Sequence, residues 1–108
     1  MSTIEATISY GPGFTKVVWE DVLAGDVTSG FECYSYSSLT LMVESSEPDY
    51  GIGGSNDGDS WVQTGWDSGV ISGSQDKRMV YLAAGFRPQF LRVGNSGTTA
   101  KITLFAVE

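Results

Sequence analysis

Residues 52–61 read IGGSNDGDSW, and β-like runs with alternating apolar and polar residues flank them at 38–45 and 61–66. The central Asn56-Asp57-Gly58 combines residue types that tolerate positive φ, which the two-residue turns of β-hairpins require. The stretch therefore predicts an antiparallel β structure in which Asn56, Asp57 and Gly58 form a hairpin turn.

The same alternation recurs along the chain, and clusters of Gly, Asn, Asp and Ser separate the runs. This spacing predicts an all-β fold: an antiparallel β-sandwich or jelly-roll-like barrel of about eight short strands, in one domain over 1–108. Residues 67–78 are polar and rich in Gly and Ser, which predicts a loop, and residues 94–97 predict a turn. The expected β-like runs are 3–10, 14–23, 31–36, 39–44, 50–54, 61–66, 79–84, 89–93 and 99–107.

The last run, 99–107, has apolar residues on both faces. Ile102, Leu104 and Ala106 fall on one side, and Phe105 and Val107 fall on the other. This pattern predicts a central strand, or a second apolar face that a neighbouring subunit covers.

The N-terminal residues 1–13 allow two interpretations. Ile4, Ile8 and Tyr10 share one face of an alternating run, which Gly11-Pro12-Gly13 ends. The segment is either the first strand of the sandwich or an extended arm that adds a strand to the edge of a neighbour.

Composition fits one folded domain with an acidic surface. The chain has 108 residues, 41% of them hydrophobic, which argues against disorder. Thirteen acidic residues against six basic ones give a net charge of −7. Such a surface repels phosphate groups, so neither nucleic acid nor an anionic membrane is an expected partner.

The chain has one cysteine, Cys33, and no histidine. An intramolecular disulfide, a zinc site built from Cys and His, and a His-based catalytic triad are therefore excluded. Because no His can activate Cys33, we expect it to be a small buried apolar residue. The N-terminus lacks the pattern of a signal peptide and no apolar run is long enough to span a membrane, so we expect synthesis in a host cytoplasm.

Acidic residues offer two weak candidates for chemistry. Asp57 and Asp59 flank Gly58 in an oxygen-rich segment that resembles a calcium loop, but the spacing and terminal Glu of an EF-hand are missing. Glu20 and Asp21 could form a carboxylate pair for glycoside hydrolysis, but a domain of this size rarely provides the cleft. We therefore expect a polar turn at 56–59, with no metal, no cofactor and no catalytic residue.

Tryptophans and arginines are candidates for binding. Trp19, Trp61 and Trp66 can form a platform for sugars, and they are equally expected in a core or a subunit interface. Arg87 and Arg92 can pair with acidic residues of a neighbouring copy, although an ordinary surface pair would contribute little.

Three motifs occur in a consistent order over roughly residues 17–107. Trp19 precedes Leu23-Ala24-Gly25-Asp26; the run 39–43 leads to Gly54-Ser55-Asn56-Asp57-Gly58 and Trp61; and Phe86-Arg87-Pro88 precedes Gly94 and a terminal strand. In this order the chain resembles a family of small structural proteins from the head gene clusters of tailed bacteriophages. Its short central strand and residues 48–51 depart from the family pattern.

The resemblance implies a non-enzymatic capsid decoration (cement, or head-stabilising) protein. It would sit on the capsid surface of a virion, often as a homotrimer, with the major capsid protein as its partner. Ile4, Ile8 and Tyr10 are then the candidate contacts of an N-terminal arm. Many weak equivalent contacts would clamp adjacent capsomers.

Two alternatives remain open from the sequence. A carbohydrate-binding β-sandwich module would require exposed aromatic rings, such as Trp61 and Trp66, in one stripe. A tail or baseplate component of a phage would have the same β-rich pattern as a head protein.

Overall fold

The computed structural model describes residues 2–64, 70–73, 77–82 and 88–108, and every regular element in these ranges is a β-strand. None of the described segments is a helix that could span a membrane. The longer strands are β2 (Thr7–Gly11), β3 (Phe14–Val22), β6 (Ser38–Glu44), β7 (Tyr50–Ser55), β9 (Val70–Gly73), β10 (Lys77–Leu82), β11 (Phe90–Asn95) and β12 (Ala100–Val107). The two-residue strands are β1 (Thr3–Ile4), β4 (Val27–Thr28), β5 (Phe31–Glu32) and β8 (Val62–Gln63).

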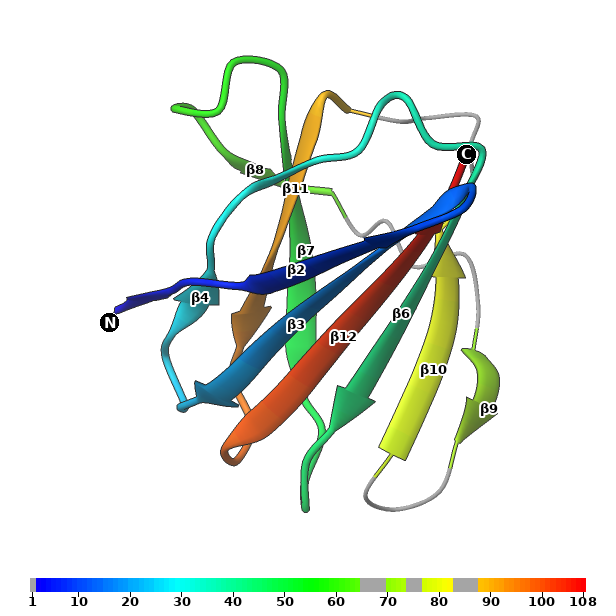
Figure 1. The fold of residues 1–108 in the computed structure, drawn as a ribbon. Coiled ribbons are helices and arrows are strands. Elements are labelled where there is room, and N and C mark those ends of the chain that lie inside the picture. Colours follow the sequence, from blue (N-terminus) through cyan, green and yellow to red (C-terminus); the bar gives the residue numbers. More distant parts are fainter. Residues whose placement is uncertain (1, 65–69, 74–76, 83–87) are drawn as a thin grey trace.

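The strands form two six-stranded sheets that face each other, with one sheet in front of the other in Figure 1. Sheet A has the order β1-β4-β11-β7-β8, with β5 also paired to β11, and sheet B has the order β2-β3-β12-β6-β10-β9. Apart from the parallel pair of β1 and β4, the strand pairs are antiparallel. The predicted all-β sandwich is therefore confirmed.

The core lies between the two sheets, where the alternating positions of the sequence converge. Leu39, Leu41 and Val43 of β6 are buried, while the residues between them are less covered. The same period of two holds along β11 and β12, since successive side chains of a strand point to opposite faces. Trp19 is completely buried and donates a hydrogen bond from Nε1 to the Ser29 Oγ, 3.1 Å away.

Strand β12 is central in sheet B, between β3 and β6. This position accounts for the apolar residues on both of its faces. Leu104 points into the core and is fully buried, whereas Phe105 points outward and is 40% exposed. One of the two expectations for the last run, a central strand, is thus met.

Several local predictions were wrong. The expected loop over 67–78 contains β9 and the start of β10, both of which gain hydrogen-bonded partners in sheet B. Gly94 and Asn95, expected in a turn, end strand β11. The expected run 31–36 is a strand only at Phe31–Glu32. Parts of the expected runs 61–66 and 79–84 lie outside the described residues.

The N-terminal residues divide between the two sheets. Strand β1 pairs with β4 of sheet A, where the Ser2 carbonyl accepts a bond from the Val27 N–H and the Ile4 carbonyl accepts one from the Ser29 N–H. Strand β2 pairs with β3 and forms one end of sheet B. Residues 2–11 therefore pack along the sandwich in this chain, with β2 as an edge strand.

Candidate functional site

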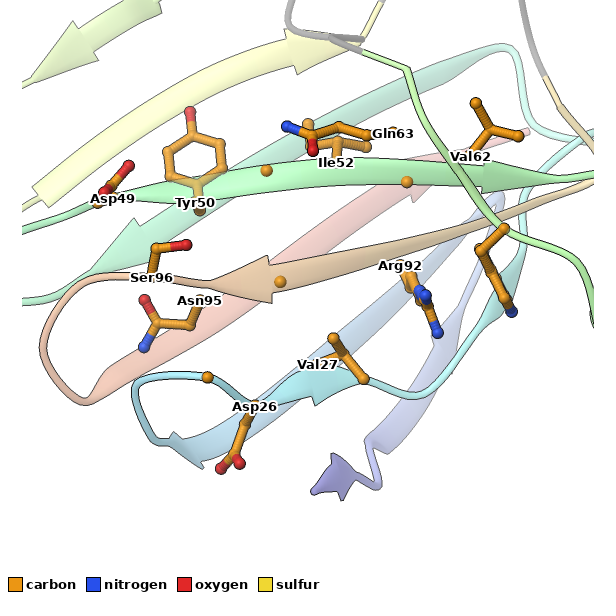
Figure 2. A pocket seen from close by; sticks show the side chains of 15 residues that line it. Asp26, Val27, Asp49, Tyr50, Ile52, Val62, Gln63, Arg92, Asn95 and Ser96 are labelled. Atoms are coloured by element: carbon orange, nitrogen blue, oxygen red, sulfur yellow. The ribbon is translucent and has the colours of Figure 1, made fainter. Parts of the chain in front are cut away.

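A shallow groove lies on the outer face of sheet A and has a volume of about 370 Å³ (Figure 2). Strands β4, β11, β7 and β8 form it, together with Trp61 just before β8. The volume falls within the range of about 300–1,000 Å³ that small-molecule sites occupy. Both aromatic and charged side chains of the described residues line this groove.

Glycines make up much of the groove floor. Gly51 lies opposite Gly94, and Gly53 lies opposite Arg92 in the pairing of β7 with β11. Ile52, between the two glycines of β7, points the other way and is buried in the core. A floor without side chains allows a ligand or another backbone to approach the sheet closely.

Arg92 and Trp61 form one end of the groove. The Arg92 guanidinium carbon lies 4.6 Å from the centre of the Trp61 ring, a cation–π contact. The arginine stem crosses the bare backbone of Gly53, where an added Cβ would lie 3.6 Å from the Arg92 Cγ. Stacking uses the flat face of the guanidinium, whereas its N–H donors lie in the plane and point sideways.

Gln63 extends the polar lining from β8. It is registered with Gly53, and an added Cβ on Gly51 would lie 3.1 Å from its Nε2 atom. The Gln63 amide therefore lies over the glycine floor. Together with Arg92 it gives the groove planar polar groups next to one aromatic ring.

The other end of the groove is structural. Asp26 is buried, and its carboxylate accepts one bond from the Leu23 N–H and one from the Ser2 N–H, each at 3.0 Å. Asn95 is also buried and bonds to three backbone groups. The hydrogen bonds of both side chains hold the backbone of turns, so neither side chain is a candidate for acid–base chemistry.

Asn56, Asp57 and Gly58 lie in the connection between the antiparallel strands β7 and β8, but this connection is not the two-residue turn that was predicted. Residues 56–61 make a longer connection between β7 and β8, and of the three only Gly58 has a positive φ, 82°. The turn is held instead by side chains, because Ser55 Oγ accepts bonds from the Asp57 and Gly58 N–H groups. Such side-chain-to-backbone bonds are an alternative to the compact two-residue turn.

Asp57 caps this connection. Its Oδ1 accepts bonds from the N–H groups of Asp59 and Ser60, at 2.8 and 2.9 Å, and one from Ser55 Oγ at 2.9 Å. The backbone bonds from Ser60 and Asp59 hold the pKa of Asp57 below its ordinary value. Among the described residues no three Asp, Glu or Cys side chains cluster as a metal site would require.

Replacing Asp57 by alanine is expected to lower the melting temperature at neutral pH. The ionised carboxylate stabilises the fold above the ordinary pKa of 3.8, and this contribution is lost as the pH falls through the lower pKa of the folded state. Thermal unfolding of both proteins from pH 7 down to pH 2 tests this. The two melting temperatures should converge at the acid end, and a constant gap would contradict the prediction; Asp59→Ala, in the same segment, is the matched control.

The other candidates among the described residues lie apart from the groove. Cys33 is buried, as expected, and donates to the Pro88 carbonyl. Glu20 and Asp21 are exposed next to each other in sequence, and Glu20 forms a 3.6 Å ion pair with Lys101. Trp19 is a core residue. The last two candidates, Trp66 and Arg87, lie outside the described residues.

The three proposed arm contacts are placed differently. Ile4 is partly buried against the core. Ile8 pairs with Val17 and Tyr10 pairs with Thr15, so both point toward the core side of sheet B. They are nevertheless 44% and 77% exposed, because they lie on the edge strand.

No family model and no curated protein matches this chain. Among solved structures, a cupin domain from Bordetella pertussis is 12% identical, with 100% of this chain and 98% of that chain covered and a TM-score of 0.51. A further cupin protein, RmlC-like and from Desulfovibrio desulfuricans, is 12% identical over 94% and 79% of the chains, with a TM-score of 0.45. The Streptomyces albus protein HEPD, solved with 2-hydroxyethylphosphonate and Fe(II), is 13% identical over 94% and 20%, with a TM-score of 0.44.

The likeness to the Bordetella domain shows the fold alone. This chain is an all-β sandwich, and its fold is similar to that of the cupin, or double-stranded β-helix, domain. Non-haem iron centres built from two histidines and a carboxylate need residues that this sequence does not contain, since it has no histidine.

Sequence reasoning missed the groove. The signal was present at Gly51 and Gly53, because glycines two positions apart in a strand leave one face bare. Both glycines fall in the expected β-like run 50–54, which leads to the predicted turn. Gly94, the partner of Gly51, lies 43 positions further along the chain and is brought to it by strand pairing.

Proposed function

We propose that this chain is a non-enzymatic structural protein of a tailed-phage virion that binds the major capsid protein and stabilises the shell as a decoration protein. The observation that carries the proposal is the edge strand β2 with its exposed Ile8 and Tyr10. The motif order over residues 17–107 supports it, as does the rigid two-sheet fold.

Strand β2 suits attachment to another protein. As the end strand of sheet B it offers one side of its backbone to a further strand, which is how extended segments join an existing sheet. Ile8 and Tyr10 stand on one face of that strand and can fill pockets on the partner, which would give the contact its specificity. Exposed edges with large apolar side chains are usually protected in monomeric proteins.

Many copies on the shell would each make the same weak contact, and these contacts would add up. Copies at equivalent lattice positions would clamp adjacent capsomers, so that the shell gains stability without any single strong bond. The homotrimer that the family resemblance implies is proposed for copies seated on the shell. A net charge of −7 would keep the chain soluble at high copy number.

Co-sedimentation with capsids tests the proposal. The probe is a shell assembled from the major capsid protein of the proposed phage. The wild type is expected to sediment with the shells, and an Ile8→Ser/Tyr10→Ser variant is expected to bind at least tenfold more weakly, through the loss of two apolar anchors. Leu23→Ser/Tyr34→Ser is the matched control, since both side chains are more than half exposed elsewhere.

Each outcome has a separate meaning. A wild-type chain that stays in the supernatant would contradict the decoration role. If the Ile8→Ser/Tyr10→Ser variant and the control bound the shells with equal affinity, the contact would lie elsewhere on the surface. Co-sedimentation with purified tails in place of heads would favour the tail or baseplate alternative.

A second candidate function rests on the groove in sheet A. Trp61, Arg92 and Gln63 surround a glycine floor, an arrangement of one aromatic ring and planar polar groups that suits a saccharide. Trp61 is half-buried and already stacked by Arg92, which leaves less of its face for a sugar. A glycan screen with the wild type and Trp61→Ala decides between binding in the groove and no binding.

A further inference from the structure

The outer face of sheet B is unusually apolar for an uncovered surface. We call it the B face and define it by the outward side chains of β3, β12, β6 and β10. Sheet B lies toward the viewer in Figure 1, with sheet A behind it. The apolar members of the B face are Phe14, Val18, Met42, Met79, Tyr81, Phe105 and Val107, all partly or largely exposed.

Strand register places these side chains in continuous rows. Thr103 lies between Val18 and Met42, and Met42 lies beside Met79 in the next strand. In the neighbouring row Phe105 lies beside Thr40, which lies beside Tyr81. In these rows only threonines separate the apolar side chains of β12, β6 and β10, and so many large apolar side chains on one exposed face of a small protein usually mark an interface.

A row of alternating charges borders the apolar rows. Lys101 is registered with Glu44, and Glu44 is registered with Lys77. Glu20 completes the row through its 3.6 Å ion pair with Lys101. From β3 to β10 the signs are therefore negative, positive, negative and positive.

We infer that the B face pairs with the B face of a second copy of this chain. A two-fold axis parallel to the strands, above the line between β12 and β6, would place β12 opposite β6 of the second copy, and β3 opposite β10. Lys101 then faces Glu44 of the other copy, and Glu20 faces its Lys77. Each of these contacts between opposite charges occurs twice in the dimer, because an isologous interface repeats every contact across its two-fold axis.

The same axis matches the apolar rows. Val18 faces Met79 of the other copy, Thr103 faces Met42, and Lys16 faces the Tyr81 ring, where a cation–π contact can form. Two sheets that pack face to face keep their strands within about 30° and lie about 10 Å apart, which suits side chains of these sizes. The pairing turns the outer surface of sheet B into a second core.

The B face is large enough for a reversible pair. Its four strands, about 4.8 Å apart, and seven residues of about 3.3 Å each give a patch of roughly 19 by 23 Å. This footprint is about half of the ~800 Å² per partner of standard interfaces, so the pair is expected to be of the weaker, concentration-dependent kind. A purely acidic or purely basic partner would leave half of the charge row opposed by like charge, whereas a second copy supplies the alternating order.

Light scattering across a dilution series tests the pairing, with variants that leave the core intact. The wild type is expected to have the mass of two 11.6 kDa chains. Thr103→Glu puts two like charges near the axis in an apolar setting and should raise the dissociation constant by roughly a hundredfold or more. Val62→Glu, at a 68% exposed position of sheet A, is the matched control and should leave the dimer unchanged.

Exchanging the charges of Lys101 and Glu44 tests the proposed geometry of the paired B faces. Lys101→Glu alone should weaken the dimer at least tenfold, because residues 101 and 44 of opposite copies would then repel. Lys101→Glu/Glu44→Lys should restore wild-type dimerisation, since the exchanged pair again meets its opposite. A monomer or a three-chain mass for the wild type, a dimer that survives Thr103→Glu, or no rescue by the double variant would each overturn the inference, whether or not the chain binds a capsid.

Discussion

Trp19→Ala is expected to lower the free energy of unfolding by about 3–5 kcal/mol, the largest loss for a single core residue in this chain. The indole is fully buried and lies beside Ile102 in sheet B, so its removal leaves a cavity between the sheets. The substitution also leaves the Ser29 Oγ without its 3.1 Å donor. The free energy of unfolding of a domain of this size is roughly 5–15 kcal/mol in total, so the variant should be close to unfolding at 37 °C.

Urea denaturation with tryptophan fluorescence and circular dichroism measures this loss. Trp19→Phe is the first control, because it keeps most of the volume and should lose only about 1–2 kcal/mol. Trp61→Ala is the second, since Trp61 is only half-buried at the edge of the groove. Equal losses for Trp19→Ala and Trp61→Ala would contradict the placement of Trp19 at the centre of the core.

Asn95→Asp is expected to cost about 2–5 kcal/mol, although it replaces one side chain by another of the same shape. The Asn95 amide donates to the carbonyls of Val22 and Thr98, each at 2.8 Å, and its Oδ1 accepts from the Gly97 N–H at 3.0 Å. In an ionised aspartate the oxygen that replaces Nδ2 would face both carbonyl oxygens, which are acceptors too, in a buried site. Each buried group left unpaired costs about 1–3 kcal/mol, and more when it is charged.

The exposed position Asn56 offers a matched control for the same substitution. Asn56 bonds through Oδ1 to the Gln89 N–H, a contact that an aspartate can keep. Asn56→Asp should therefore change the unfolding free energy by less than about 0.5 kcal/mol. If both substitutions had the same small effect in urea denaturation, Asn95 would not anchor the end of β11.

The sandwich could be predicted because its signal is local. A period of two along 39–44 and 99–107 marks the face that must be buried, whatever the partner strand is. Strand β9 was missed for the opposite reason. Its Gly- and Ser-rich surroundings have low intrinsic β propensity, and it becomes a strand through its pairing with β10 at the edge of the sheet.

The groove and the B face depend on register, which the sequence does not display. Gly51 meets Gly94, and Lys101 meets Glu44, only because strands distant in the chain are aligned residue by residue. Asn95 illustrates the same point on a smaller scale. Its residue type suggested a turn, but its side chain closes a network that reaches back to Val22.

All three lysines of the chain, Lys16, Lys77 and Lys101, stand on the outside of sheet B, while sheet A contains none. Amine-reactive dyes, biotin esters and lysine cross-linkers will therefore modify the B-face lysines of the monomer, and pairing of two B faces will protect the same amines. A monomeric chain immobilised through these lysines will present the groove of sheet A to solvent. Lysine chemistry thus distinguishes the outer face of sheet B from that of sheet A.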